Sequence, residues 1–490
     1  MKNRIIASVI FSAILLTAVS CGDQADDQGA VSDTQPVSTA ETEAPIQIFS
    51  DSLPERDYNG ENYTVLAAAE QWAKKFHAEE QTGDIIEDAV FTRNQAVEER
   101  FNVKLVYDFV DGYMAGKETV QQKLYNAVMA GDATYDLYVG DSYYIAGQVL
   151  DGIFANLTEM EYLDFSQPYW FQYINPNLRV GDVQFTACGA FDLQTVGENW
   201  VILFNKELSA QFDMPSFYED VRNGSWTMDK FMTYAAQVVG DLNGDAVFDH
   251  NDRYGLLSTQ NEAFIGLNYG MGRTITEVGE DGLPYLTGAD EKIVTIMDKL
   301  TVLMKENHLY FGSEENNPST TIVPMFSNNQ GLFLCYLLRI LETEAVRNSC
   351  DFGVLPLPKY DEAQKTYHSC SIANISAIPF VCPDAERSQI ILEALNSASY
   401  SLTLPAYKEQ ALQRKLTRDD ESADMLDLIF AGGICDFGLS YVEQIKNELY
   451  VVGHVLSGRQ DWATWWAKQE KSATRNLQKL IDTMVELGDR

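Results

Sequence analysis

Short apolar runs alternate along the chain with stretches in which apolar residues recur at every third or fourth position. Between residues 63 and 139 this pattern predicts strands at 63–66, 102–107 and 135–139, with helices between them. Strands that alternate with helices form a sheet of parallel strands that is covered by helices on both faces. The sequence therefore predicts an α/β fold.

Polar and aromatic side chains follow two of the predicted strands. Ligands bind beyond the carboxyl ends of parallel strands, so the residues after 63–66 and after 135–139 are expected to share one mouth. These residues are Glu70, Gln71, Trp72, Asp141, Tyr143 and Tyr144. Packing in the core or at the rim is the alternative interpretation of each aromatic residue.

Residues 225–252 combine an amphipathic helix with an acidic loop. Ser225 or Thr227 can cap the helix, and its apolar residues fall three or four positions apart. In the loop, oxygen side chains stand at positions 1, 3, 5, 9 and 12, and a backbone carbonyl stands at position 7, as in loops that wrap one Ca²⁺. In that order the residues are Asp241, Asn243, Asp245, Asp249 and Asp252, with Val247 supplying the carbonyl.

This match predicts a structural calcium ion, although two positions depart from the pattern. Position 6, where glycine is usual, is Ala246, and position 12 is Asp252 in place of the longer glutamate. A solvated acidic turn, stabilised by side-chain to backbone hydrogen bonds, is the alternative.

The chain opens with Lys2 and Arg4 ahead of an apolar run at 5–19, which is typical of a signal peptide and short for a spanning helix. The end of this run, LTAVSC at 16–21, resembles a bacterial lipobox, which predicts lipidation of Cys21. An ordinary signal peptide and an uncleaved anchor are the alternatives. Residues 22–57 are acidic, carry no Lys or Arg before Arg56, and predict a flexible spacer.

Composition narrows the possible partners. The chain has 72 acidic and 35 basic residues, for a net charge of −37, which argues against a nucleic-acid partner and disfavours an anionic ligand.

The residues after the spacer suffice for two domains. The six cysteines after Cys21 show no CxxC or zinc-type spacing, and their pairing stays open. The chain has no HExxH, G-x-S-x-G or Walker motif, so we predict no enzymatic activity.

The order of several short segments resembles the family 1 extracellular solute-binding proteins, the sugar-capturing lipoproteins of ABC importers. The resemblance extends from about residue 60 to the end of the chain. The segments are YDL at 135–137, GIFANLT at 152–158, FNKEL at 204–208, WTMDKF at 226–231, YGL at 254–256, FGVLPLP at 352–358, PAY at 405–407 and LSGR at 456–459.

The resemblance implies a type II, periplasmic-binding-protein-like fold of two discontinuous α/β lobes. Residues 58–195 and 369–402 would form the first lobe, and residues 196–368 and 403–490 the second. The chain would cross between the lobes near 192–197, 368–371 and 400–404. Closure about such crossings is a hinge motion that buries a ligand between the lobes.

The implied function is capture of a sugar or oligosaccharide and its delivery to ABC permease subunits by a monomeric, membrane-anchored receptor outside the cytoplasm. Aromatic faces cover the C–H surface of a sugar, and carboxylates or amides bind its hydroxyl groups. Asp192, at the first crossing, and Trp200, just past it, therefore join the candidate ligand-binding residues. Two other interpretations stay open: a surface interaction module or sensor partner, and a secreted glycan-active enzyme.

Overall fold

The computed structural model describes residues 47–68, 70–110, 116–288, 290–306, 308–311, 320–371, 373–412, 419–446 and 461–490. Residues Ile46–Arg490 form one compact unit, to which the description below applies. The predicted signal peptide, Cys21 and spacer residues 22–46 lie outside the described residues. No helix among the described ones is both long enough and apolar enough to cross a membrane.

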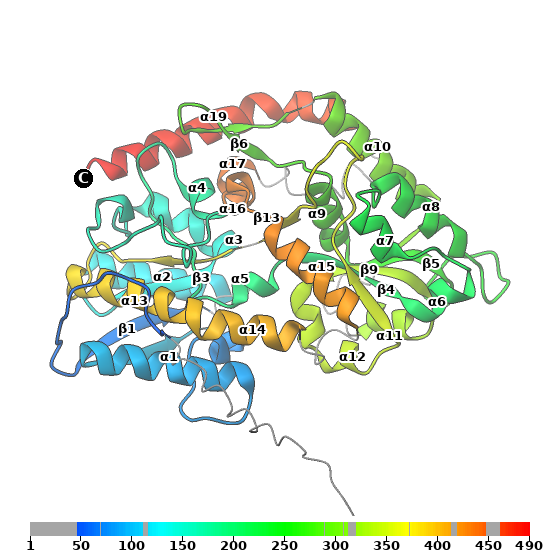
Figure 1. Ribbon diagram of the computed structural model, residues 1–490. Helices are drawn as coiled ribbons and strands as arrows, with labels where there is room; N and C mark the ends of the chain where they lie inside the picture. The colour runs from blue at the N-terminus through cyan, green and yellow to red at the C-terminus, as the bar shows by residue number, and fades with distance from the viewer. Residues whose placement is uncertain are drawn as a thin grey trace, which may run out of the picture. The chain divides into compact units, whose positions relative to one another are not determined.

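The first sheet has the strand order β12-β3-β1-β2 (Figure 1). Its strands are β1 (Glu61–Ala67), β2 (Val103–Phe109), β3 (Leu137–Asp141) and β12 (Asn374–Ala377). β1 pairs in parallel with both β2 and β3, so the predicted parallel sheet is confirmed. β12 comes from far along the chain and closes the edge beside β3 in antiparallel register.

The second sheet has the order β10-β4-β9-β5-β8. Its strands are β4 (Trp200–Asn205), β5 (Tyr254–Ser258), β8 (Leu309–Phe311), β9 (Gly331–Leu337) and β10 (Phe352–Leu355). The carboxyl ends of β5, β9 and β10 and the amino end of β4 lie at the same edge, because β4 runs antiparallel to both β9 and β10. Two small sheets pair β11 (Ser369–Cys370) with β13 (Gly433–Ile434) and β6 (Thr276–Val278) with β7 (Pro284–Leu286).

Helices surround both sheets. Those near the first are η1 (Glu70–Lys75), α1 (Ile85–Phe101), α2 (Lys117–Met129), α3 (Ser142–Ile145), η3 (Ala146–Asp151), η4 (Leu157–Glu159), α4 (Asn175–Leu178) and α13 (Ala385–Ser401). Those that follow or precede strands of the second are α6 (Lys206–Gln211), α7 (Phe217–Arg222), α8 (Met228–Val238), α9 (Gln260–Gly270), α10 (Glu291–Lys305), α11 (Ile322–Ser327), η6 (Leu338–Glu342), α12 (Glu344–Arg347) and α15 (Asp420–Ala431). The remaining helices are α5 (Gln194–Gly197), α14 (Thr403–Leu412), α16 (Phe437–Ser440), α17 (Val442–Lys446) and α19 (Trp462–Gly488).

Local signals in the sequence account for several of these boundaries. The Thr227 side chain accepts a hydrogen bond from the backbone N–H of Lys230 and caps α8, as predicted. Phe231, Tyr234 and Val238 form the buried stripe of this helix, which packs against β5. The tryptophans of α19 likewise lie on its buried face.

The chain passes between the two sheets more than once. It leaves the first sheet after β3 and enters the second at β4, by way of α5, and it returns between β10 and β12. The predicted crossings at 192–197 and 368–371 fall within these intervals. The third crossing, predicted near 400–404, differs in position. Helix α14 still packs against α1, beside the first sheet, before the chain reaches α15. The lobe boundaries themselves stay a prediction.

Residues 47–57 are predicted as the end of a flexible spacer, but in the structure they contact the rest of the compact unit. The Asp51 carboxylate forms an ion pair with Arg100 at 2.8 Å, and the Ser50 backbone N–H donates to the Ser397 hydroxyl. Arg56 pairs with Glu386 at 2.7 Å. Ile48, Phe49 and Leu53 also pack against the core. Composition missed these contacts because a few apolar residues and single ion pairs stand within a segment that is otherwise polar and acidic.

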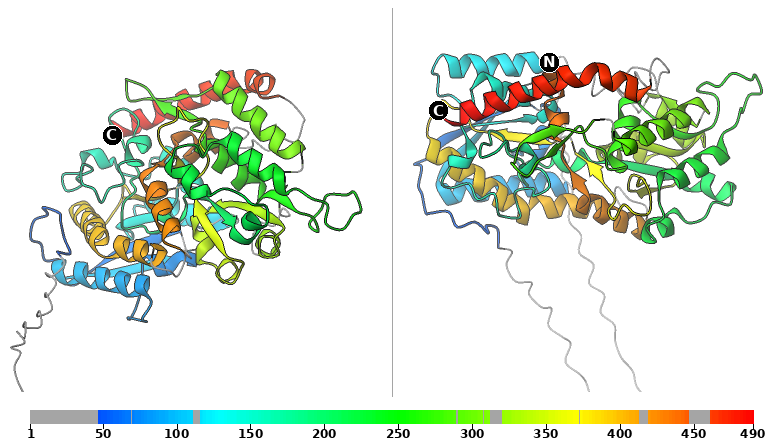
Figure 2. Two further views of the ribbon diagram at one scale, coloured as in Figure 1. Left: turned by 45° about the vertical axis from the view of Figure 1, so that its right-hand side comes forward. Right: turned by 90° about the horizontal axis from the view of Figure 1, so that it is seen from above.

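Helix α19 contacts parts of the molecule that are far apart in the sequence. It packs against α17 and η3 along one portion and against α10 and β7 along another. Figure 2 shows it, in red, lying across these elements. Its buried face therefore ties elements from both sides of the first crossing.

Candidate functional site

The candidate ligand-binding edges of the two sheets, predicted from the carboxyl ends of their strands, contact the same crossing segments. Asn374, at the start of β12, pairs with Asp141 at the end of β3, and its backbone N–H donates to the Thr195 hydroxyl of α5 at 3.0 Å. One residue past α5 and Glu198, Asn199 forms a β-bridge with Ser371. The two sheet edges are therefore held together through α5 and the strand that returns toward β12.

Asp141 and the tyrosines that follow it lie at the predicted edge of the first sheet. The Asp141 carboxylate accepts a hydrogen bond from the Tyr143 backbone N–H at 2.8 Å and caps α3. Tyr143 and Tyr144 are both partly exposed, and their rings pack edge to face with centroids 5.0 Å apart. Glu70, Gln71 and Trp72 lie in η1, directly after β1, and their side chains are outside the described set.

Trp200 is placed differently from the other predicted residues. Its side chain is 0% exposed, and its indole N–H donates to the Glu262 carboxylate at 2.6 Å. A tryptophan covered in this way offers no face to a sugar in this conformation. The sequence placed Trp200 near the crossing correctly but could not show that α9 covers it.

Buried acidic side chains gather around the crossing. Asp192 is 2% exposed, and the Glu198 carboxylate pairs with Arg339 of η6 at 2.9 Å. Burial raises the pKa of Asp192 and of Glu262 to about 7, and Glu198 adds to both shifts by charge repulsion. Burial likewise raises the pKa of Asp141 to about 8, with Glu198 as the next cause and Arg339 opposing it.

A second set of contacts joins the two sheets at the same edge. The Lys75 ammonium of η1 lies 3.0 Å from the Glu342 carboxylate of η6, which also accepts a hydrogen bond from the Tyr407 hydroxyl of α14 at 2.7 Å. Sequence reasoning missed Glu262, Arg339 and Glu342. The rule of carboxyl ends, applied to β5 and β9, would have indicated all three.

The raised pKa values predict that the protein loses stability as the pH rises from about 5 to about 8. A raised acid keeps its proton in the folded state between its unfolded pKa of about 4 and its folded value, while the unfolded chain has released that proton. Each such group lowers the free energy of unfolding by up to about 1.4 kcal/mol per pH unit in this window. Below pH 4 the carboxyl group is protonated in both the folded and the unfolded chain, and above its folded pKa it is ionised in both, so the slope vanishes outside this window.

Denaturant unfolding at a series of pH values measures this slope. Glu262→Gln, which keeps an acceptor for Trp200, is expected to flatten it, whereas Glu291→Gln on the exposed start of α10 is expected to leave it unchanged. Equal slopes in both variants and in the original chain would show that Glu262 is not protonated in the folded protein.

The acidic loop at 241–252 holds its carboxylates against its own backbone. Asp241 accepts hydrogen bonds from the N–H groups of Gly244 and Ala246, and Asp252, 0% exposed, accepts from Leu242 and Asp249. Ala246, at position 6, has φ +62°, the left-handed conformation for which glycine is usual at this position. Among the described residues, no three His, Cys, Asp or Glu side chains are grouped to hold a metal.

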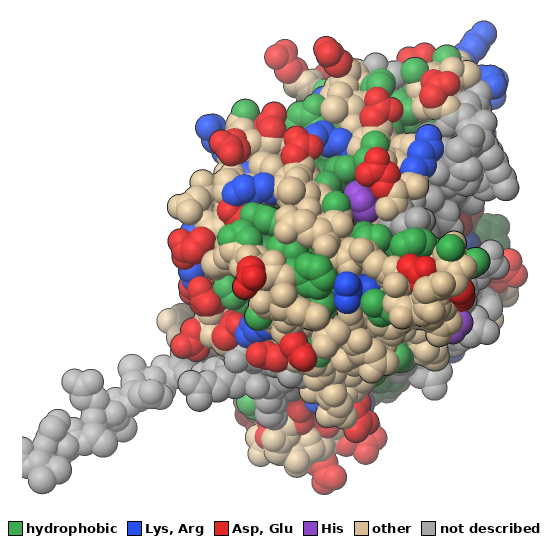
Figure 3. All heavy atoms as spheres, turned by 90° about the vertical axis from the view of Figure 1, so that its right-hand side faces the viewer, with side chains coloured by type: hydrophobic (Ala, Val, Ile, Leu, Met, Phe, Trp, Pro, Cys, Tyr) green, Lys and Arg blue, Asp and Glu red, His purple; other side chains and the backbone are tan. Residues whose placement is uncertain are grey.

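Charged side chains of both signs are mixed on the surface shown in Figure 3. On the face that Figure 3 shows, acidic side chains are spread between neutral ones, with basic side chains among them rather than gathered in one patch.

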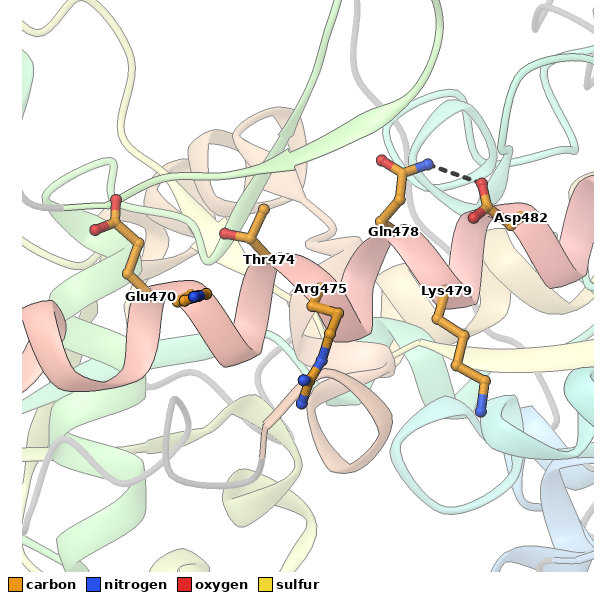
Figure 4. Close-up of a pocket in the computed structure, with 7 residues that line it drawn as sticks. Glu470, Thr474, Arg475, Gln478, Lys479 and Asp482 are labelled. Carbon is orange, nitrogen blue, oxygen red and sulfur yellow. Dashed lines mark hydrogen bonds between the residues drawn. The ribbon is translucent and has the colours of Figure 1, made fainter.

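A hollow of about 730 Å³ follows the exposed side of α19 and is lined by charged and polar residues of this helix alone. Its side chains, drawn in Figure 4, extend outward from the helix, and Gln478 donates to Asp482 at 2.8 Å.

No family model and no curated protein sequence matches the chain. Solved structures do match it. The GacH receptor of Streptomyces glaucescens, solved without ligand and with acarbose, aligns with a TM-score of 0.53 at 12% identity, covering 87% of this chain and 99% of its own. The cyclic α-maltosyl-1,6-maltose binding protein of Arthrobacter globiformis aligns with a TM-score of 0.57 at 12% identity, covering 85% of this chain and 99% of its own.

A sugar transporter protein of Rhizobium etli, solved in an open conformation, gives a TM-score of 0.55 at 13% identity and covers 85% of this chain and 99% of its own. At such identities the likeness concerns the fold. The predicted fold class is thereby confirmed: the chain has the two-lobe α/β fold of these three proteins.

Proposed function

We propose that the protein is the substrate-binding receptor of an ABC importer, which captures a sugar or oligosaccharide between its two sheets and delivers it to membrane permease subunits. One observation carries the proposal. The ligand-binding edges of both sheets meet at α5, where the partly exposed Tyr143 lies beside Asp141 and near the buried acids of the crossing.

The chemistry of this edge favours a neutral, hydroxyl-rich ligand. Tyrosine rings offer flat faces for C–H groups, and carboxylates and amides accept hydrogen bonds from hydroxyl groups. The net charge of −37 disfavours an anionic ligand. Affinity would come from stacking and hydrogen bonds alone, without a covalent step.

Thermal melting of the purified protein with a panel of neutral mono- and oligosaccharides tests the proposal. A ligand that binds only the folded state adds about 2.7 kcal/mol at a hundred times its dissociation constant. We expect one sugar class to raise the melting temperature without being consumed. Consumption of the sugar would favour the glycan-active enzyme, and no response to any sugar would favour the surface interaction module.

Attachment to the membrane through Cys21 completes the proposal. Several acyl chains on one residue give lasting attachment, so a lipidated receptor would stay beside its permease. We expect the protein to partition with membranes and Cys21→Ser to release it into the medium. Membrane retention of Cys21→Ser would instead point to an uncleaved anchor.

We also propose that the loop at 241–252 binds one structural Ca²⁺ through Asp241, Asn243, Asp245, Asp249, Asp252 and the Val247 carbonyl. The left-handed conformation of Ala246 supports the proposal, because it removes the objection that this position lacks glycine. Binding would require Asp241 and Asp252 to give up some of their present backbone hydrogen bonds.

Removal of calcium is therefore expected to lower the melting temperature. Millimolar calcium should raise it relative to chelator, since an ion that binds only the folded state stabilises that state. Asp245→Ala should abolish the difference, whereas Asp281→Ala, in another exposed turn where the carboxylate accepts from the Leu283 N–H, should retain it. A melting temperature that ignores both calcium and chelator would leave the loop as a solvated turn.

A further inference from the structure

A groove of about 500 Å³ lies beside the candidate ligand-binding edge and shares only Tyr144 with the candidate residues described above. It is lined by residues of α2, of α3 and η3, and of α17, the first and last of which are labelled in Figure 1. Its volume falls within the range of about 300–1,000 Å³ that is usual for small-molecule sites. Four helices line it, in contrast to the hollow along α19, which one helix lines.

Four amide side chains and four charged side chains line this groove. Gln121 and Gln122 of α2, Gln148 of η3 and Gln444 of α17 supply amides that both donate and accept hydrogen bonds. The one cation of the lining, Lys117, already pairs with Glu443 at 2.9 Å, and Glu118 and Asp151 add negative charge. These groups suit the hydroxyls of a neutral sugar and disfavour an anion.

Gln148 gives an independent sign that a ligand belongs there. Its side chain is 5% exposed, and its amide N–H donates to the Gln121 carbonyl at 3.1 Å. Its Oε1 atom is buried and has no hydrogen-bond partner within the described part of the chain. A buried acceptor without a donor is costly, and a ligand hydroxyl that reached the groove would satisfy it.

The groove shares a wall with the candidate ligand-binding edge. Tyr144 lines the groove, and the preceding Tyr143 packs against its ring edge to face and follows Asp141 at the end of β3. Across the groove, Glu443 of α17 lies close enough to the Tyr143 hydroxyl to raise its pKa, after the larger effect of burial. A ligand bound at Tyr143 therefore needs to extend only past Tyr144 to enter the groove.

We infer that the ligand is a neutral oligosaccharide, one end of which lies at the sheet edge beside Tyr143 while a further sugar unit occupies the groove and donates a hydroxyl to Gln148. This inference rests on the proposed function and narrows its substrate class. A ligand confined to the sheet edge would leave the Gln148 acceptor unpaired in the complex, whereas a longer ligand satisfies it.

Titration calorimetry with neutral homologous series tests the inference. Glucose, maltose, maltotriose and maltotetraose form one series, and the corresponding cello-, xylo- and manno-oligosaccharides form the others. For the series that binds, we expect affinity to rise about tenfold or more with the unit that reaches the groove. Gln148→Leu should reduce that gain to about twofold or less and leave the affinity for the shorter homologue unchanged.

Two further variants keep the result interpretable. Gln444→Leu changes the wall that α17 contributes and should also reduce the gain if Gln148→Leu alone disturbs folding. Gln478→Leu, the same change on the exposed side of α19, should bind every homologue as the original chain does. Full affinity for the shortest homologue, with no dependence on Gln148 or Gln444, would overturn the inference and leave the receptor function standing. Absence of binding in every series would overturn both.

Discussion

Replacement of Asp436 by alanine is expected to lower the free energy of unfolding by about 4 kcal/mol, because it breaks a buried hydrogen-bond network. Asp436 is 1% exposed and caps α16. Its carboxylate accepts hydrogen bonds from five groups: the Tyr269 hydroxyl, the Ile275 and Thr276 backbone N–H groups, the Thr276 hydroxyl and the Gly438 N–H. Denaturant unfolding at constant pH measures the change.

The size of this effect follows from what the substitution leaves behind. The carboxylate at the start of α16 joins its own helix to the end of α9 and the start of β6, which lie 160 or more residues earlier in the sequence. Alanine removes the acceptor of the Tyr269 hydroxyl and of the Ile275 and Thr276 N–H groups, whereas the Gly438 N–H keeps the Thr276 hydroxyl as an acceptor. Each buried donor left unpaired costs about 1–3 kcal/mol.

Asp461→Ala is the matched control. Asp461 also caps a helix, accepting from the Thr464 N–H at 2.9 Å, but it is exposed, so water replaces its hydrogen bond. We expect it to cost only about 1 kcal/mol. If both variants unfolded at the same denaturant concentration, the Asp436 network would contribute no more than an ordinary cap.

Features that depend on neighbouring residues were predictable from the sequence. The strands β1, β2 and β3 follow from short apolar runs, and the cap at Thr227 follows from a residue type that competes for backbone N–H groups. The position of Asp141 and Tyr143 at the carboxyl-end edge of the first sheet was predictable, because it needs only the strand that precedes them.

Features that depend on contacts between distant parts of the chain were not predictable from the sequence. The antiparallel β12 pairs with β3 across more than two hundred residues, and no local period indicates that pairing. Trp200 is buried because Glu262 of α9 binds its indole N–H, a contact between side chains 62 positions apart. Arg339 and Glu342 were missed because they follow β9. The sequence of β9 is a continuous apolar run, which is compatible with a buried strand and with a buried helix segment.

Tyr143→Ala is expected to weaken sugar binding by about thirtyfold, which corresponds to about 2 kcal/mol. Tyr143 is the aromatic side chain that the structure places beside Asp141 with part of its surface exposed, and truncation removes a stacking face together with its apolar area. Calorimetry with the sugar that stabilises the original chain measures the loss, and melting without ligand shows whether the variant is folded.

Tyr285→Ala provides the comparison for this substitution. Tyr285 is a more exposed tyrosine in β7, 48% exposed, and its hydroxyl donates to Glu277 at 2.7 Å. Its removal should leave sugar affinity unchanged, since β7 lies outside both sheets whose edges form the site. If the two variants bound sugar equally well, the ligand would not stack on Tyr143. The edge of the first sheet would then contribute through Asp141 and the side chains of η1, and replacement of Trp72 would become the decisive experiment.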